Sequence, residues 1–375
     1  MHTFKSMTGA VAFIAVSVAM PALATEYNAN HFFAERHSLV RGPYVEFAKK
    51  VEEATGGEIA FRVFSGGSLV PASASLQGVR DGVAQVTYHA GTYTPAELPI
   101  ENLIGNMAFY NTDPFVMAMA STEFSMTNKA ALEEWKRNGV VFAGGYSTSE
   151  YYMICNQPIQ TLEDVKGKRM RMAGGAWSRF AEFVGAVPVS IPSSEMYTGL
   201  DTGSLDCAVT PGDSIDSFSL GDVINSMNTL AIGNYYAGFL WGYNEAFWKG
   251  LSTEQRAVLF DQMAYFMAKG RVEFSADVDK AIDTAVANGM KVYEPDQALV
   301  DALAEFVASD EAALIASAKE RGVADPEAIL TVFKAIVDRW DALLEGVDRT
   351  DVDALAELAR TEIYGKIDPA TYGVD

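Results

Sequence analysis

Four basic side chains stand close together in the segment EDVKGKRMRMAGG, residues 163–175. They are Lys166, Lys168, Arg169 and Arg171. The whole sequence, by contrast, has a formal net charge of -21. In a strand, successive side chains point to opposite faces, so Arg169 and Arg171 would share one face and the methionines beside them the other. Because a guanidinium offers two donors that match a carboxylate or a sulfonate, the segment indicates an anion-binding site.

The residues alone leave two interpretations of Arg171 open. Ligands of open α/β sheets bind at the carboxyl ends of the strands, and Arg171 lies at that end, just before AGG and the next expected helix. An internal salt bridge, or plain exposure to solvent, explains Arg171 equally well. For Lys166, Lys168 and Arg169 a solvated surface is the better interpretation.

Short strands and amphipathic helices alternate along the chain and must position these side chains. Residues 41–57 predict a helix, and residues 58–64 a strand that follows it. A short helix over 73–82 and a second strand over 83–91 come next, and the pattern recurs from residue 140 to residue 210. This order predicts an α/β protein with two lobes, each built on a mostly parallel sheet that is covered on both faces.

A much longer helix is predicted to begin at Ser252. Ser252 and Gln255 form a capping box, and apolar residues then keep one face as far as Asn288-Gly289. At 1.5 Å per residue, such a helix is about 50 Å long. Since one small domain is narrower than this, we expect the helix to brace both lobes.

The first 24 residues have the pattern of a cleaved signal peptide. The apolar run over 9–20 is too short to span a bilayer, and Ala22-Leu23-Ala24 fits a signal-peptidase site. We therefore expect an exported, periplasmic protein that begins near Thr25, and a retained anchor is the alternative. The remaining residues, about 350 in number, favour two domains. Their acidic charge argues against nucleic acid or anionic lipid as a partner.

Cys155 and Cys207 are the only cysteines. Export permits a disulfide, but cysteines this far apart do not establish one, and two buried thiols are favoured. The chain has no C-x-x-C or H-x-x-x-H pair, which argues against a structural zinc site. Signatures of serine hydrolases, P-loop proteins, dinucleotide-binding proteins and zinc proteases are absent from the sequence too. We therefore expect no metal, no cofactor and no catalytic residue.

The segment LEDVKGKRMRMAGG…FVGAVPVSIPSSEMYTGLDTGSLDCAVTP resembles the core motif of the DctP-type solute-binding proteins of TRAP (tripartite ATP-independent periplasmic) transporters. That motif runs D-L-K-G-x-K-[LIM]-R-[VI], then G-A-x-P-x-x-[LMI], then S-E-x-Y-x-A-L-Q-x-G-x-[VI]-D-G. The similarity extends to about Ala335 with the same order and spacing. It implies a two-lobed periplasmic-binding-protein fold, and it places the ligand-clamping arginine of the family at Arg171.

The resemblance also implies where further solute contacts lie. Thr210 stands where family members often carry asparagine, so it keeps a hydroxyl group but lacks the amide. A looser alignment suggests other ligand-binding candidates near strand ends: Tyr151, Ser193, Tyr236, Trp177, Tyr88, His89 and Phe32, with His37 as the alternative to Phe32. For the aromatic side chains a place in the core is an equally good interpretation. For His89 a structural role is the better one.

We expect the chain to divide into four parts. Residues 1–24 form the signal peptide. Residues 25–149 with about 237–270 form the first lobe, and residues 150–236 with about 271–346 form the second. Residues 347–375 form a C-terminal helical tail.

The sequence thus predicts a receptor, not an enzyme. It would close on a small organic acid anion, a carboxylate or a dicarboxylate, and deliver it to the TRAP membrane permease. An exported hydrolase acting in the same cleft is the alternative, and a scavenging or sensory protein of the same fold is a third hypothesis. The sequence leaves open which solute is bound, whether a metal ion accompanies it, and whether the protein is a monomer or a homodimer.

Overall fold

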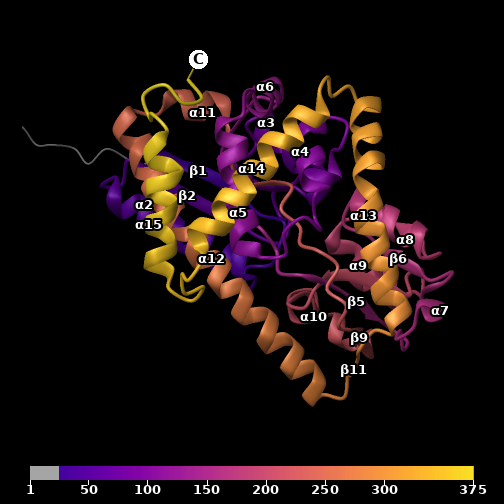
Figure 1. The fold of residues 1–375 in the computed structure, drawn as a ribbon. Coiled ribbons are helices and arrows are strands. Elements are labelled where there is room, and N and C mark those ends of the chain that lie inside the picture. Colours follow the sequence, from indigo (N-terminus) through magenta and orange to yellow (C-terminus); the bar gives the residue numbers. More distant parts are fainter. Residues whose placement is uncertain (1–24, 375) are drawn as a thin grey trace, which may run out of the picture.

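Two β-sheets organise residues 25–374, which the computed structural model describes. Each sheet is the centre of one lobe, and the two-lobed α/β fold predicted from the sequence is confirmed (Figure 1). We call the two parts the five-stranded lobe and the six-stranded lobe. The predicted signal peptide, residues 1–24, lies outside the described residues.

The sheet of the five-stranded lobe has the order β2-β1-β3-β10-β4. Its strands are β1 (Thr25–Asn30), β2 (Ile59–Phe64), β3 (Val86–Ala90), β4 (Val140–Gly144) and β10 (Gly238–Asn244). β1 pairs in parallel with β2 and β3, whereas β10 is antiparallel to both β3 and β4.

The sheet of the six-stranded lobe has the order β11-β9-β5-β8-β6-β7. Its strands are β5 (Tyr151–Cys155), β6 (Arg169–Arg171), β7 (Val187–Val189), β8 (Cys207–Pro211), β9 (Ser226–Asn228) and β11 (Lys291–Tyr293). β6 is parallel to β7 and β8, but β5 is antiparallel to β8 and β9. Both sheets are therefore mixed, and the prediction of a mostly parallel sheet is wrong for the five-stranded lobe, where β10 pairs antiparallel on both sides. β5 and β10 enter their sheets directly from the other lobe, without the covering helix that a parallel connection usually needs.

Helices surround both sheets. Before residue 150 they are α1 (Ser38–Val40), η1 (Arg41–Glu46), α2 (Phe47–Ala54), α3 (Ser75–Arg80), α4 (Pro99–Gly105), α5 (Pro114–Thr127) and α6 (Lys129–Arg137). Between residues 160 and 250 they are α7 (Leu162–Val165), α8 (Gly175–Phe183), α9 (Met196–Asp201), α10 (Ser214–Ser217) and α11 (Glu245–Gly250). The last four are α12 (Thr253–Ala287), α13 (Gln297–Glu320), α14 (Pro326–Leu344) and α15 (Val352–Glu362).

The long predicted helix is α12, which has 35 residues. Its capping box is present, because Ser252 Oγ accepts a hydrogen bond from the Gln255 amide and Gln255 Oε1 accepts one from the Ser252 amide. The helix packs against α1, α2 and α15 in the five-stranded lobe and against α10 in the six-stranded lobe. In Figure 1 it runs as a rod from α15 down toward β11.

The C-terminal helices return over the molecule. α13 contacts α7 and α8 of the six-stranded lobe and α4 of the five-stranded lobe, and α14 packs on α5 and α4. α15 lies along α12. The chain thus crosses between the lobes again after residue 300, and the predicted division of residues 271–346 stays a prediction.

Cys155 and Cys207 form a disulfide, so the prediction that favoured two buried thiols is wrong. The two residues lie directly opposite each other on the antiparallel strands β5 and β8, with Cα atoms 4.1 Å apart. This proximity comes from the register of two strands, which spacing along the sequence does not reveal. Within residues 25–374, no helix is both long enough and apolar enough to pass through a bilayer.

Candidate functional site

A small cavity of about 40 Å³ lies between the two lobes. Its walls are formed by Phe33, His37, Leu39, Tyr88, Ala90, Thr92, Tyr93, Thr148, Tyr151, Arg171, Ala173, Ser193, Thr210, Pro211, Asp213, Ser214, Phe218, Tyr235 and Phe274. The five-stranded lobe contributes mainly aromatic and aliphatic side chains. The six-stranded lobe contributes Arg171, Asp213 and the hydroxyl groups of Tyr151, Ser193, Thr210 and Ser214.

A wider groove of about 900 Å³ shares His37 and Asp213 with this cavity and runs along α10 and the second half of α12. Its arginines already have partners in the protein. Arg36 donates to the carbonyl oxygens of Asp216 and Ser217, and Arg41 pairs with Asp277. We therefore take the enclosed cavity, and not the groove, as the candidate site.

Arg171 is the cation in the cavity wall. It ends β6, and only 3 % of its surface is exposed. Its Nε donates to the carbonyl oxygen of Ile191 (3.2 Å) and its Nη1 to that of Val209 (3.3 Å). These bonds use two of its five N–H groups. Among residues 25–374 no carboxylate forms an ion pair with Arg171, so the internal salt bridge that the sequence left open is not found.

The other basic side chains of the segment lie at the surface, as the sequence predicted. Arg169 is exposed and pairs with Asp206 through both Nε and Nη2. Lys166 pairs with Glu163. Arg169 and Arg171 stand two residues apart on one short strand, yet only Arg171 reaches the space between the lobes.

Three further predicted residues lie in the wall with Arg171. Tyr151 begins β5, and burial raises the pKa of its phenol while the charge of Arg171 opposes that rise. Thr210 lies on β8, where its hydroxyl bonds to Ser214 Oγ at 2.7 Å. Ser193 follows β7 and presents both its amide and its hydroxyl toward the five-stranded lobe.

The Ser193 contacts join the two lobes across the cavity. The Ser193 amide donates to Tyr93 Oη (2.9 Å), and Tyr93 Oη donates to Ser193 Oγ (3.2 Å). Arg36 makes a second connection, because its Nη2 reaches the carbonyl oxygen of Ser217 at 2.8 Å. The structure therefore describes a closed arrangement, in which side chains of one lobe bond to the other.

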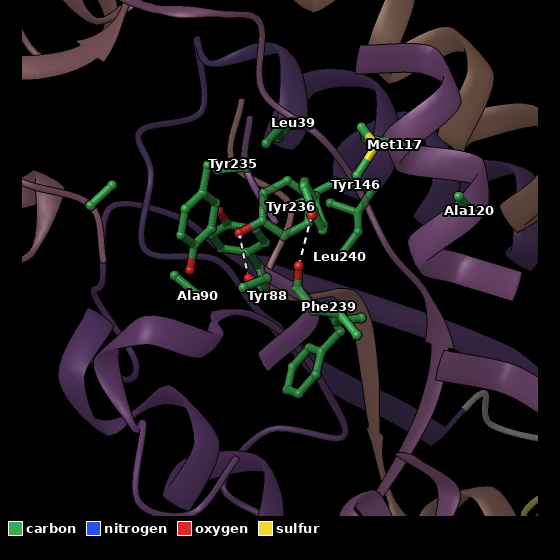
Figure 2. Close-up of a cluster of buried hydrophobic side chains, with 14 of the residues drawn as sticks. Leu39, Tyr88, Ala90, Met117, Ala120, Tyr146, Tyr235, Tyr236, Phe239 and Leu240 are labelled. Carbon is green, nitrogen blue, oxygen red and sulfur yellow. Dashed lines mark hydrogen bonds between the residues drawn. The ribbon is translucent and has the colours of Figure 1, made fainter. Parts of the chain in front are cut away.

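Tyr88 is the predicted residue that stands in the wall of the five-stranded lobe. Its ring stacks on His31, with centroids 4.3 Å apart, and lies 4.9 Å from Tyr146. Figure 2 shows Tyr88 and Tyr146 close to Tyr235, whose ring lies 6.1 Å from that of Tyr146. Of these three rings, those of Tyr88 and Tyr235 line the cavity and give it an aromatic wall.

Four predicted residues do not line the cavity. Phe32 packs against the rings of Tyr88 and Tyr93, and Tyr236 donates to the carbonyl oxygen of Ile104 in the core. Their sequence neighbours Phe33 and Tyr235 line the cavity instead. Phe32 and Phe33 lie in a bend after β1, and Tyr235 and Tyr236 lie in the irregular segment before β10, so neighbouring side chains there point in different directions and an error of one position exchanges the cavity for the core.

Trp177 and His89, the other two, are held inside the protein. Trp177 stacks behind Tyr151 and donates from Nε1 to the carbonyl oxygen of Ile232. Both ring nitrogens of His89 are bonded, Nδ1 to Ser75 and Nε2 to Thr94, each at 2.8 Å. Burial lowers the pKa of His89 to about 3. This agrees with the structural role that the sequence favoured for it.

Sequence reasoning did not single out Asp213. It follows β8 by two residues, is only 4 % exposed, and lies 3.2 Å from His37 Nε2 of the other lobe. The signal that could have revealed it is its position, because it stands just past the carboxyl end of the strand that carries Thr210. Within residues 25–374, no group of three or more His, Cys, Asp or Glu side chains is arranged to hold a metal ion.

Comparison with known proteins gives two matches in sequence, one to a family model and one to a single relative. The sequence model of the bacterial extracellular solute-binding proteins of family 7, DctP, matches residues 29–312. A solute-binding protein of Albidiferax ferrireducens is 28% identical over 214 residues, which are 54% of this chain and 58% of that relative. The match thus spans less than two thirds of that relative's length.

Solved structures agree in fold. A TRAP periplasmic solute-binding protein of Bordetella bronchiseptica, with bound (R)- and (S)-mandelate, is similar with a TM-score of 0.73 and 20% identity, over 84% of this chain and 99% of that one. A TRAP solute-binding protein of Rhodoferax ferrireducens, in complex with copurified benzoate, is similar with a TM-score of 0.77 and 20% identity, over 85% of this chain and 99% of that one.

Proposed function

Because this chain belongs to the bacterial extracellular solute-binding proteins of family 7, we propose that it is the periplasmic receptor of a TRAP transporter and binds a small organic acid anion between its lobes. One observation carries the proposal. Arg171 is buried in the cavity wall, and its hydrogen bonds to residues 25–374 go to two neutral carbonyl groups. A buried cation without an ion-pair partner is costly, and the carboxylate of a solute would supply that partner.

The mechanism we propose is closure around an ion pair. An open form would admit the solute, and its carboxylate would meet the free N–H groups of Arg171. Closing the lobes removes water, which strengthens the charge-assisted hydrogen bonds. The contact between Tyr93 and Ser193 then holds the lobes together. The chain itself makes and breaks no covalent bond in this cycle.

The partners follow from the same proposal. The leader, residues 1–24, would direct export to the periplasm, and the closed receptor would deliver its solute to the TRAP membrane permease. We propose that the hinge between the lobes lies in the two crossings at residues 145–150 and 229–237 and in α12. Mandelate and benzoate, named for two structural relatives, are carboxylates with an aromatic ring, and the aromatic wall at Tyr88 supports a solute of that kind.

A thermal-shift screen tests this function. Purified protein is heated with benzoate, mandelate, lactate or succinate, and a receptor should gain melting temperature with at least one of these acids. Each acid that stabilises the protein is then recovered and analysed by NMR. A receptor returns it unchanged, whereas an enzyme of the alternative class converts it. Absence of any shift across organic acids of this size would contradict the proposal.

A further inference from the structure

We propose that the solute carries a hydrogen-bond donor, a hydroxyl or an amino group, in addition to its carboxylate, and that Asp213 binds this donor. The inference rests on the proposed function, because it takes the pairing of a solute carboxylate with Arg171 as its starting point. It adds the chemical class of the solute: a monocarboxylate with a donor group nearby, rather than a plain carboxylate or a dicarboxylate.

Asp213 has one oxygen bonded and one without a partner. Its Oδ2 lies 3.2 Å from His37 Nε2 and accepts from Ser217 Oγ at 3.2 Å. Its Oδ1 is fully enclosed and accepts no hydrogen bond from residues 25–374. An enclosed carboxylate oxygen without a donor carries a desolvation cost, which a donor group on the solute would remove.

The contact with His37 occupies only one oxygen of Asp213. His37 Nδ1 accepts a hydrogen bond from the Leu39 amide at 3.1 Å. In the neutral imidazole the proton therefore sits on Nε2, which faces Asp213 Oδ2. The contact with His37 Nε2 thus satisfies Oδ2 and leaves Oδ1 free to accept a hydrogen bond from a solute.

Asp213 and Arg171 stand at the same edge of one sheet. Arg171 lies at the end of β6, opposite Ala208 of the neighbouring parallel strand β8, and Asp213 follows the end of β8. Both side chains line the same small cavity. A solute held by Arg171 therefore presents its nearby substituents to Asp213. A donor there is attracted, whereas a second carboxylate is repelled.

The test compares solutes that differ in one substituent. Mandelate, phenylglycine, phenylacetate and phenylmalonate share a phenyl-substituted acetate and carry hydroxyl, ammonium, hydrogen and carboxylate. Lactate, alanine, propionate and methylmalonate repeat the series on a smaller scaffold for a small cavity. Dissociation constants are measured by isothermal titration, with both enantiomers of each chiral acid. We expect the hydroxyl or the ammonium compound to bind at least tenfold more tightly than the hydrogen and carboxylate compounds, and the tighter of the two identifies the donor.

Substitution of Asp213 locates the acceptor. In Asp213→Ala the preference for the donor compound should fall to within about twofold, while the affinity for the hydrogen compound changes little. Asp213→Asn keeps an acceptor oxygen, so it should retain a preference for the hydroxyl compound but lose a preference for the ammonium compound. This variant replaces Asp213→Ala in the test if the alanine variant does not fold. Asp216→Ala removes an exposed carboxylate from the same helix, α10, and should leave the preference unchanged.

Two outcomes would overturn the inference while leaving the receptor function in place. The first is that the hydrogen compound binds as tightly as the donor compounds in the unmodified protein. The second is that the preference for the donor compound survives in Asp213→Ala. If all eight acids fail to bind and the thermal-shift screen also shows no stabilising acid, the proposed function itself is contradicted.

Discussion

The two lobes bury ionisable side chains in different ways. In the five-stranded lobe, Glu134 accepts hydrogen bonds from the amides of Ile100 and Glu101 at the start of α4, and the Glu101 side chain accepts from the Gly238 amide and Ser125 Oγ. Both carboxyl groups are almost completely buried. Each of their four oxygens thus has a donor within the same lobe.

Arg171 of the six-stranded lobe is equally buried. Its hydrogen bonds to the described residues use two of its five N–H groups, and no carboxylate among those residues forms an ion pair with it. The difference separates two uses of a buried ionisable side chain. A side chain whose hydrogen bonds are all made within the protein supports the fold, whereas one with free donors at a cavity is available to a ligand. Substitution of Arg171 should therefore change solute affinity, whereas substitution of Glu134 should change the free energy of unfolding.

The largest effect is expected from Arg171→Ala. Removal of the guanidinium should weaken solute binding by at least about 100-fold, because charge-assisted hydrogen bonds contribute roughly 1.5–3 kcal/mol each. The melting temperature without ligand should change little, since a buried cation without a counter-charge adds little stability. Titration with the best acid of the thermal-shift screen measures the first effect, and calorimetry measures the second.

Arg169→Ala is the matched control, because it removes the exposed arginine of the same strand. It should leave affinity unchanged and cost less than about 1 kcal/mol of stability, as surface ion pairs do. Equal affinity of Arg171→Ala and the unmodified protein would show that Arg171 is not the anchor.

Glu134→Ala should show the reverse pattern. Two amides at the start of α4 would lose their acceptor in the core, which costs about 3 kcal/mol or more of folding free energy. Affinity for the solute should remain within a few-fold, because Glu134 does not line the cavity. Urea unfolding gives the stability, and Glu133→Ala, an exposed neighbour, should have almost no effect. If Glu134→Ala lost affinity for the solute but kept its stability, the distinction drawn between Glu134 and Arg171 would be wrong.

The same carboxyl groups predict that stability falls as the pH rises. Burial raises the pKa of Glu101 to about 8 and that of Glu134 to about 7, from an ordinary value of 4.5. Below pH 4.5 both groups hold their protons in the folded and the unfolded chain. Above it, the unfolded chain releases protons that the folded chain keeps, so the free energy of unfolding decreases up to pH 7 to 8.

Each retained proton contributes at most about 1.4 kcal/mol per pH unit. Urea unfolding at pH 5, 6, 7 and 8 should therefore show a shallower decrease in Glu101→Gln than in the unmodified protein. An identical slope in the two proteins would show that Glu101 does not retain its proton.

The smallest effect is expected from the contact between the lobes. Tyr93→Phe removes the hydroxyl that bonds to both the amide and the hydroxyl of Ser193. One such contact stabilises the closed form by about 1 kcal/mol, so solute affinity should fall about fivefold. Stopped-flow measurements should place the change mainly in the dissociation rate. An unchanged dissociation rate would mean that this contact does not hold the lobes closed.

Much of the fold was predictable because it depends on local patterns. The capping box at Ser252 and the apolar face that follows it predicted α12 closely. Alternation in KRMRM separated Met170, which is fully buried, from the arginines on the other face. β10 was not predicted, because its continuous apolar run carries no alternation and its partners, β3 and β4, lie far away in the sequence.

The candidate site was predictable only in part. Arg171, Thr210, Tyr151, Ser193 and Tyr88 lie in the cavity wall, whereas Phe33 and Tyr235 stand there in place of Phe32 and Tyr236. Sequence patterns show that a strand ends near these positions. They do not show which of two neighbouring side chains faces the space between the lobes, since that depends on how each sheet is turned toward the other.

The sequence by itself determined the α/β character, the bracing helix and the cationic strand, because each depends on residues that are near one another in the chain. Only the tertiary structure decided that Cys155 meets Cys207, that Arg171 finds no carboxylate among residues 25–374, and that Asp213 lies beside His37. These are contacts between distant strands and between lobes. They depend on strand register and on closure, and neither leaves a periodic signal in the sequence.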